Sequence, residues 1–283
     1  MQKEIKSAVL LIIFSSLLCL TGCSSQKAIK VSEAQEKYWN TLSSNVVVLY
    51  KQGKYNEAFK YADEALKVAK HLYGKNSPKV AASLNNIAEI YRANGDYSKA
   101  ESLYKQAIKI DEKTLGKDSI DVAKDLNNLS VLYRATGKLN EAEALSKRAL
   151  SIREKVLEKD DPEIAISLSN LGVIYRVQGK FKDAEPLFKK ALSIREASFG
   201  KEHPDIAVSL NNLAELYSAE KKYTEAEPLF KRSISILEKT LGKEHPNVAA
   251  VMRNLSAMYK DMGKNDLAQA LDKTVIAILS KKQ

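Results

Sequence analysis

The stretch that decides the fold spans residues 200–241 and reads GKEHPDIAVSLNNLAELYSAEKKYTEAEPLFKRSISILEKTL. Shifted by 42 residues in either direction along the chain, it aligns with a similar stretch. The aligned copies begin at Gly74, Gly116, Glu158 and Gly242 and contain no insertion or deletion. A sixth, divergent copy occupies residues 32–73. A fixed period of this length is typical of repeat proteins, in which each unit buries its apolar face against the next.

Each copy predicts two helices joined by a short turn. In one copy Asp161 is the expected N-cap of the first helix, Pro162 occupies its first position, and Gly179 ends it in the left-handed conformation. Lys221 stands where the other copies have glycine, so we expect its turn to be strained or differently built. Pro186 is expected close to the start of the second helix, where its missing N–H has no helical acceptor.

The first 22 residues predict a secretory signal. Lys3 and Lys6 precede an apolar run over residues 8–20, which is too short to cross a bilayer as a helix. The Leu-Thr-Gly-Cys that ends at Cys23 resembles the bacterial lipobox, and this resemblance implies lipidation of Cys23 after cleavage before it. Two alternatives are an uncleaved short anchor and ordinary signal cleavage beside an incidental cysteine. Residues 23–31 are then a short lipid-bearing tether.

Export determines the expected location and excludes one class of partner. We expect a bacterial cell-envelope protein attached to a membrane through its N-terminal lipid, on the periplasmic side of the outer membrane where one exists. The chain has 283 residues and a formal net charge of +10, with 45% hydrophobic and 28% charged residues. Lysines are scattered along the chain, which indicates a solvated surface. We therefore expect no nucleic-acid partner.

Small residues recur at two positions of each copy, and they point to a family. One position in the first helix and an alanine in the second match those of the tetratricopeptide repeat. The first set is Ala88, Ser130, Gly172, Ala214 and Ser256, and the second is Ala58, Ala100, Ala142, Ala184, Ala226 and Ala268. The 42-residue length and the Leu-Asn-Asn-Leu phrase resemble the kinesin-light-chain subtype.

The resemblance implies an all-α, right-handed solenoid of about six helix pairs over residues 32–283. The expected repeats are residues 32–73, 74–115, 116–157, 158–199, 200–241 and 242–283. The last copy carries Asn265 and Asp272 where earlier copies have aromatic residues, so we expect its outer face to meet water.

No catalytic or metal-binding pattern is recognisable, so we predict that the protein is not an enzyme and has no cofactor or metal. The three histidines are His71, His203 and His245, and the last two lie in equivalent turns where a helix-capping role is expected. The sequence contains no phosphate-binding glycine loop and no nucleophile elbow. The many glutamates are interpreted as solvated surface charges.

Binding is the function that the pattern favours. One face of the first helices carries asparagine at the same position in five copies, between small or apolar residues, and this class of repeat holds extended peptides on that face. The expected groove residues are Asn86, Asn128, Asn170, Asn212 and Asn254, the apolar Val131, Ile166, Val173 and Val177, and the flanking Arg92, Arg134 and Arg176. An amide can pair with both backbone groups of a peptide, and arginines favour an acidic neighbour.

Two functions follow from these observations. The protein is predicted to be a membrane-anchored adaptor or assembly factor that binds a protein or an extended peptide in the groove. The alternative is a structural repeat array that self-associates and has no specific peptide ligand. A structural role for the asparagines, as residual repeat similarity, is also consistent with the pattern.

Overall fold

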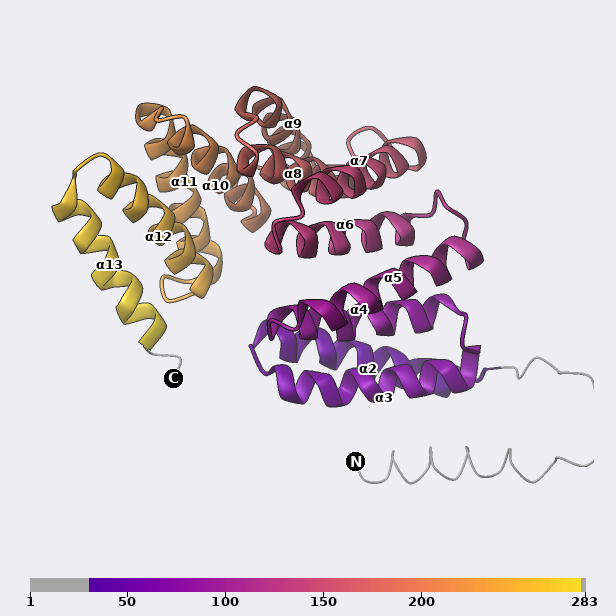
Figure 1. Ribbon diagram of the computed structural model, residues 1–283. Coiled ribbons are helices and arrows are strands. Elements are labelled where there is room, and N and C mark those ends of the chain that lie inside the picture. The colour runs from indigo at the N-terminus through magenta and orange to yellow at the C-terminus, as the bar shows by residue number, and fades with distance from the viewer. Residues whose placement is uncertain (1–30, 281–283) are drawn as a thin grey trace, which may run out of the picture. The chain divides into compact units, whose positions relative to one another are not determined.

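The computed structural model describes residues 31–280 and shows twelve helices and no strand in that range (Figure 1). The chain forms two compact units, up to Thr114 and from Leu115 onward. This is the all-α tetratricopeptide solenoid class predicted from the sequence. In the first unit the helices are α2 (Glu33–Lys51), α3 (Tyr55–Tyr73), α4 (Pro78–Ala93) and α5 (Tyr97–Thr114).

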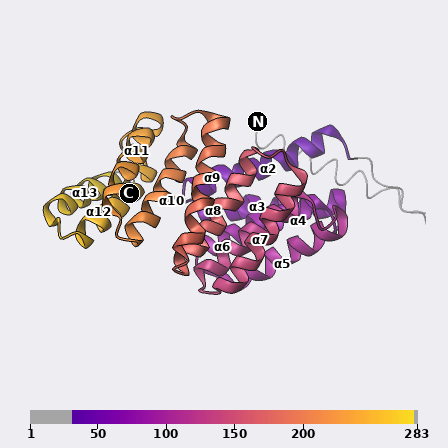
Figure 2. The same cartoon turned by 90° about the horizontal axis from the view of Figure 1, so that it is seen from above.

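The second unit contains four helix pairs. Their bounds are α6 (Ile120–Ala135), α7 (Leu139–Val156), α8 (Pro162–Val177), α9 (Phe181–Phe199), α10 (Pro204–Ala219), α11 (Tyr223–Leu241), α12 (Pro246–Asp261) and α13 (Asn265–Ser280). The two helices of a pair lie side by side, as α8 and α9 or α12 and α13 show (Figures 1 and 2). Among the first helices, α6 contacts α8, α8 contacts α10, and α10 contacts α12, so these four helices form one layer of the unit.

The helix ends follow the sequence closely. Asp161 accepts a hydrogen bond from the Glu163 backbone N–H at 2.8 Å, and His203 Nδ1 accepts one from Asp205 at 3.2 Å. The capping role expected for the turn histidines is therefore confirmed. The expectation for Pro186 is wrong: α9 begins at Phe181, so this proline occupies the sixth position and removes an internal helical hydrogen bond.

The small position of the first helix marks the closest approach within each pair. A Cβ atom added to Gly172 would lie 2.7 Å from Cε1 of the buried Phe188 in α9. In the preceding pair Ser130 Oγ donates to the Ala142 carbonyl at 3.1 Å, so backbone and side chain are in direct contact there. Larger side chains do not fit such contacts without displacing a helix, because protein interiors are close-packed.

Polar side chains connect successive pairs in the second unit. Glu185 of α9 accepts a hydrogen bond from the Tyr217 hydroxyl of α10 at 2.8 Å, and Glu227 of α11 accepts one from Tyr259 of α12 at 2.9 Å. Glu143 occupies the equivalent position in α7. It forms ion pairs with Lys147 of the same helix and with Lys180, which directly precedes α9. These two lysines lower the pKa of Glu143 to about 2. The interpretation of all the glutamates as solvated charges is therefore wrong for these positions.

Two buried arginines form a further connection between pairs. Arg153 of α7 is 2% exposed and donates to Ser167 of α8 at 2.5 Å, and Arg195 of α9 is 7% exposed and donates to Ser209 of α10 at 2.5 Å. Burial lowers the pKa of both guanidinium groups. Arg153 also pairs with Glu163 at 2.9 Å, which compensates part of the cost of burying its charge.

The last helix, α13, carries two exposed apolar side chains on its outer face. Ile276 is 67% exposed and Leu279 is 39% exposed. One period earlier, Leu237 is buried and Ile234 is partly buried against the core that includes α12 and α13 residues. The expectation that this face meets water therefore agrees with the structure, in which two of the exposed side chains are apolar.

Lys221 has a positive φ of 61°, whereas Gly95, Gly137, Gly179 and Gly263 occupy the equivalent turns. The strained turn predicted from the sequence is confirmed. We expect Lys221→Gly to raise the free energy of unfolding by about 0.5–1 kcal/mol, because glycine lacks the Cβ that disfavours this conformation. Urea unfolding monitored by circular dichroism measures the change. Gly179→Ala is the matched reverse substitution and should lower stability, and a loss on Lys221→Gly would contradict the strain.

Candidate peptide-binding wall

The predicted groove residues of the second unit occupy one face of its first helices. Asn128, Asn170, Asn212 and Asn254 come from α6, α8, α10 and α12, and each side chain is partly buried. Ile166, Val177 and Val208 are exposed on the same stripe, and Val131 and Val173 are partly buried. We call this surface the inner wall. Exposed aliphatic side chains in a row are the feature expected of a binding surface more than of a solvated one.

The central asparagines have free amides. Within residues 31–280, no hydrogen bond joins the side chains of Asn128, Asn170 or Asn212 to another protein group. The neighbouring Asn127 differs, because it is buried and donates to Ser167 at 3.0 Å. Of the two adjacent asparagines, the first therefore joins repeats and the second is available to a ligand. An available amide offers a donor and an acceptor at the same place.

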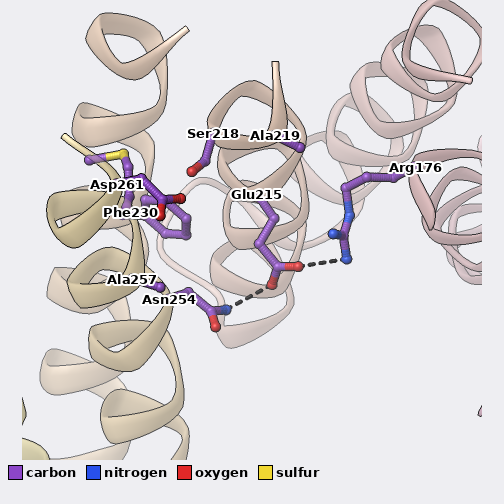
Figure 3. Close-up of a pocket in the computed structure, with 9 residues that line it drawn as sticks. Arg176, Glu215, Ser218, Ala219, Phe230, Asn254, Ala257 and Asp261 are labelled. Carbon is purple, nitrogen blue, oxygen red and sulfur yellow. Dashed lines mark hydrogen bonds and ion pairs between the residues drawn. The ribbon is translucent and has the colours of Figure 1, made fainter. Parts of the chain in front are cut away.

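Asn254 is the exception among the asparagines of the wall. Its Nδ2 donates to Glu215 at 2.7 Å and to Asn211 at 3.0 Å, and Asn211 donates to the same Glu215 oxygen at 2.6 Å. Arg176 of α8 forms an ion pair with the other oxygen of Glu215 at 2.7 Å. Figure 3 shows this chain of contacts from Arg176 through Glu215 to Asn254. The network joins α8, α10 and α12 across three repeats.

A pocket of about 250 Å³ opens beside this network. Two of its lining residues, Phe230 of α11 and Met258 of α12, are buried and form its apolar floor. Asp261 of α12, which is exposed, also lines the pocket (Figure 3). The remaining lining residues are Arg176, Glu215, Ser218, Ala219, Asn254 and Ala257. Sequence reasoning missed Ser218, Phe230 and Met258. Phe230 belongs to a second helix, and no periodic pattern within the first helices could have indicated it.

The predicted arginines are engaged within the protein. In the first unit Arg92 pairs with Glu89 at 2.7 Å and donates to the Tyr50 hydroxyl at 3.1 Å. The Tyr104 hydroxyl also donates to Glu89. Burial raises the pKa of Tyr104, and the negative charge of Glu89 raises it further. Arg134 is partly buried in α6, and Asn86 is partly buried in α4. Because Arg92 and Arg176 already neutralise carboxylates, the expectation that they attract an acidic partner loses its basis.

Cys23, the predicted lipidation site, lies outside the described residues, as does the predicted signal that precedes it. Within residues 31–280, none of the helices is both long enough and apolar enough to cross a membrane. In the same range, no group of three histidine, cysteine, aspartate or glutamate side chains has the arrangement of a metal site.

The tetratricopeptide repeat family model matches residues 40–113, 121–197, 163–239 and 205–281. The chain therefore belongs to the tetratricopeptide repeat family. Proteins built from these repeats generally act as scaffolds that bind other proteins. None of the curated proteins matches the sequence significantly.

Solved structures with kinesin-light-chain repeats resemble this chain. Nearly identical kinesin-light-chain TPR-like repeats from Podosopora anserina share 29% identity at a TM-score of 0.58, covering 73% of this chain and 98% of theirs. BtubC (BKLC) from P. vanneervenii shares 24% identity at a TM-score of 0.62, covering 88% of this chain and 92% of its own. A Rap protein complexed with Competence and Sporulation Factor has 16% identity and a TM-score of 0.63, with 99% and 94% coverage. The two structures that share less than 25% sequence identity with this chain show similarity of fold alone.

Proposed function

We propose that the protein is an adaptor that holds an extended segment of a partner protein along the inner wall of its second unit. The free amides of Asn128, Asn170 and Asn212 are the observation that carries this proposal. They lie beside exposed Ile166 and Val177, so a peptide could pair its backbone with the amides and bury apolar side chains on the wall. The Rap protein with a bound factor gives a precedent for ligand binding on a similar fold.

The proposal includes no chemical reaction. Binding in a groove needs only hydrogen-bonding groups, apolar surface and charge, and the wall offers all three. Membrane attachment completes the proposal. A lipid on Cys23 would tether the repeats to the envelope surface, because the intervening segment of eight residues reaches at most about 30 Å. An adaptor held in this way concentrates its partner near the membrane.

The double substitution Asn128→Ala with Asn170→Ala tests the wall. A photoreactive amino acid in place of Ile166 first captures the partner in cells, and mass spectrometry identifies the segment. Titration of that segment should then show roughly ten- to hundredfold weaker binding by the double variant, since each lost neutral hydrogen bond costs about 1 kcal/mol. Thermal unfolding should change little, because these amides bond to no protein group.

Asn140→Ala with Asn265→Ala is the matched control, since both are exposed asparagines of the second unit outside the inner wall. Unaltered affinity in the wall variant would move the binding site elsewhere. A large loss of helical stability would show instead that the wall asparagines are structural.

The lipid anchor has its own test. Cys23→Ser should leave an unprocessed precursor that takes up no fatty acid, whereas the wild-type protein should be cleaved, labelled and retained on membranes after a carbonate wash. Three acyl chains bury many more methylene groups than the single chain that gives only marginal binding. Labelling with a radioactive fatty acid and membrane fractionation measure both properties. Equal processing and fractionation of the two proteins would rule out lipidation at this cysteine.

A second candidate function, self-association, is favoured by the exposed Ile276 and Leu279 on α13. Both occupy positions that the following repeat covers in the preceding pair. A second copy that packs against this face would remove them from water, and burying a large aliphatic side chain contributes about 1.5–3 kcal/mol.

Light scattering at increasing protein concentration tests this function. If the wild-type mass rises with concentration, Ile276→Ser with Leu279→Ser should abolish the rise. Leu267→Ser is the control and should leave the rise in mass unchanged. Leu267 is another exposed leucine of α13, on the opposite side of the helix from Ile276. A mass that stays monomeric at all concentrations, or that responds equally to both variants, would contradict association through this face.

A further inference from the structure

We propose that the pocket between α10, α11 and α12 takes the cationic side chain of a lysine or arginine in the bound segment. This inference rests on the proposed peptide-binding function and specifies what one site on the wall recognises. It reverses the expectation from the sequence, which assigned the arginines of the wall to an acidic partner. The reversal follows from the charges that the structure places around the pocket.

Glu215 and Arg176 neutralise each other. The two Glu215 oxygens receive three donors: Arg176 on one oxygen at 2.7 Å, and Asn254 and Asn211 on the other at 2.7 and 2.6 Å. Most of the hydrogen-bonding capacity of this carboxylate is thus already used. The positive charge of Arg176 is likewise held by Glu215, so an incoming carboxylate would have to break a charge-assisted hydrogen bond to reach it.

Asp261 supplies the unneutralised charge of the pocket. Among the residues that the structure describes, its carboxylate has no ion-pair or hydrogen-bond partner. The lining residues Arg176, Glu215 and Asp261 together carry a net charge of −1. Although Asp261 is exposed, this charge favours a cation in the pocket and disfavours an anion.

The place of Asp261 on its helix is unfavourable for the free protein. It is the last residue of α12, where the helix dipole disfavours negative charge. The last residues of α4, α6, α8 and α10 are the uncharged Ala93, Ala135, Val177 and Ala219, and α2 ends at Lys51, whose positive charge the dipole favours. The carboxylate is exposed, makes no hydrogen bond or ion pair within the described protein and opposes the dipole, so an incoming cation could pair with it without breaking an existing contact.

The rest of the pocket suits the shape of a basic side chain. Lysine and arginine have apolar stems of several methylene groups and a charged end. The stem can pack on Phe230, Met258, Ala219 and Ala257, while the charged end reaches Asp261 (Figure 3). Ser218 at the rim offers a hydroxyl acceptor for a second hydrogen bond. An apolar side chain could pack on Phe230 and Met258 but would leave the Asp261 carboxylate without a partner.

Methyl NMR on the full chain, purified in detergent, provides a direct test. The chain has only four methionines, and the Met258 methyl group lies in the pocket floor. The probes are N-acetyl-lysine methylamide, the norleucine analogue with the same stem and no charge, and the glutamate analogue. The lysine probe should shift the Met258 signal at lower concentration than norleucine does, and glutamate should leave the signal unchanged. Met258→Leu assigns the signal.

Asp261→Asn should weaken binding of the lysine probe roughly two- to tenfold and leave the norleucine response as it was. The same variant should unfold at the wild-type temperature or slightly above it, since a carboxylate is removed from a helix C-terminus. Glu225→Gln is the control, because it removes an exposed carboxylate of α11 outside the pocket. It should not affect the lysine response.

Three results would overturn the proposal: a Met258 signal that does not respond to lysine, equal responses to lysine and norleucine, or an Asp261→Asn variant that binds lysine like the wild type. These outcomes are separable from failure of the adaptor function. Loss of partner binding by the asparagine variant together with no lysine response would leave the wall intact and reject the pocket. Binding of the lysine probe, together with unaltered partner binding by the asparagine variant, would support the pocket and reject the role of the wall asparagines.

Discussion

The close approach of the two helices in each pair is the constraint on which the rest of the structure depends. At Gly172 a single methyl group would come within 2.7 Å of the Phe188 ring, and at Ser130 the side chain bonds directly to the partner helix's backbone. This contact sets how the pair packs, and the pair then presents apolar faces that only a neighbouring pair can cover. Ile276 and Leu279 show the consequence in α13, where they are exposed and the described residues contain no further pair.

Polar contacts add specificity to this apolar packing. The arginines of α7 and α9 reach serines one helix further along, and glutamates of the second helices meet tyrosines of the next first helix. A buried guanidinium is weak evidence for stability, because desolvation opposes the attraction. Its geometry is demanding, however, so each such contact favours one alignment of a pair on the next.

The inner wall illustrates how the same repeated position acquires different roles. Asn170 and Asn212 keep free amides, while Asn254 is held by Glu215, which Arg176 of another repeat also binds. The difference arises because Glu215 has an acidic side chain where α8 has Val173. One carboxylate thus converts an open stretch of the wall into a polar network beside a pocket. Adaptor proteins of this architecture gain selectivity from such local departures on a uniform scaffold.

The sequence by itself determined the period, the two helices of each copy, their caps, the small residues between them and the strain at Lys221, because these features depend on neighbouring residues or on a strict repeat. Pro186 was expected closer to the start of its helix than it lies, because the exact residue at which a helix begins is only weakly encoded by the local sequence. The sequence also named Asn254 and Arg176, but only the tertiary structure decided which charges cancel. Side chains from α8, α10 and α12 meet there across two periods, and a pattern along one helix carries no information about a partner that far away.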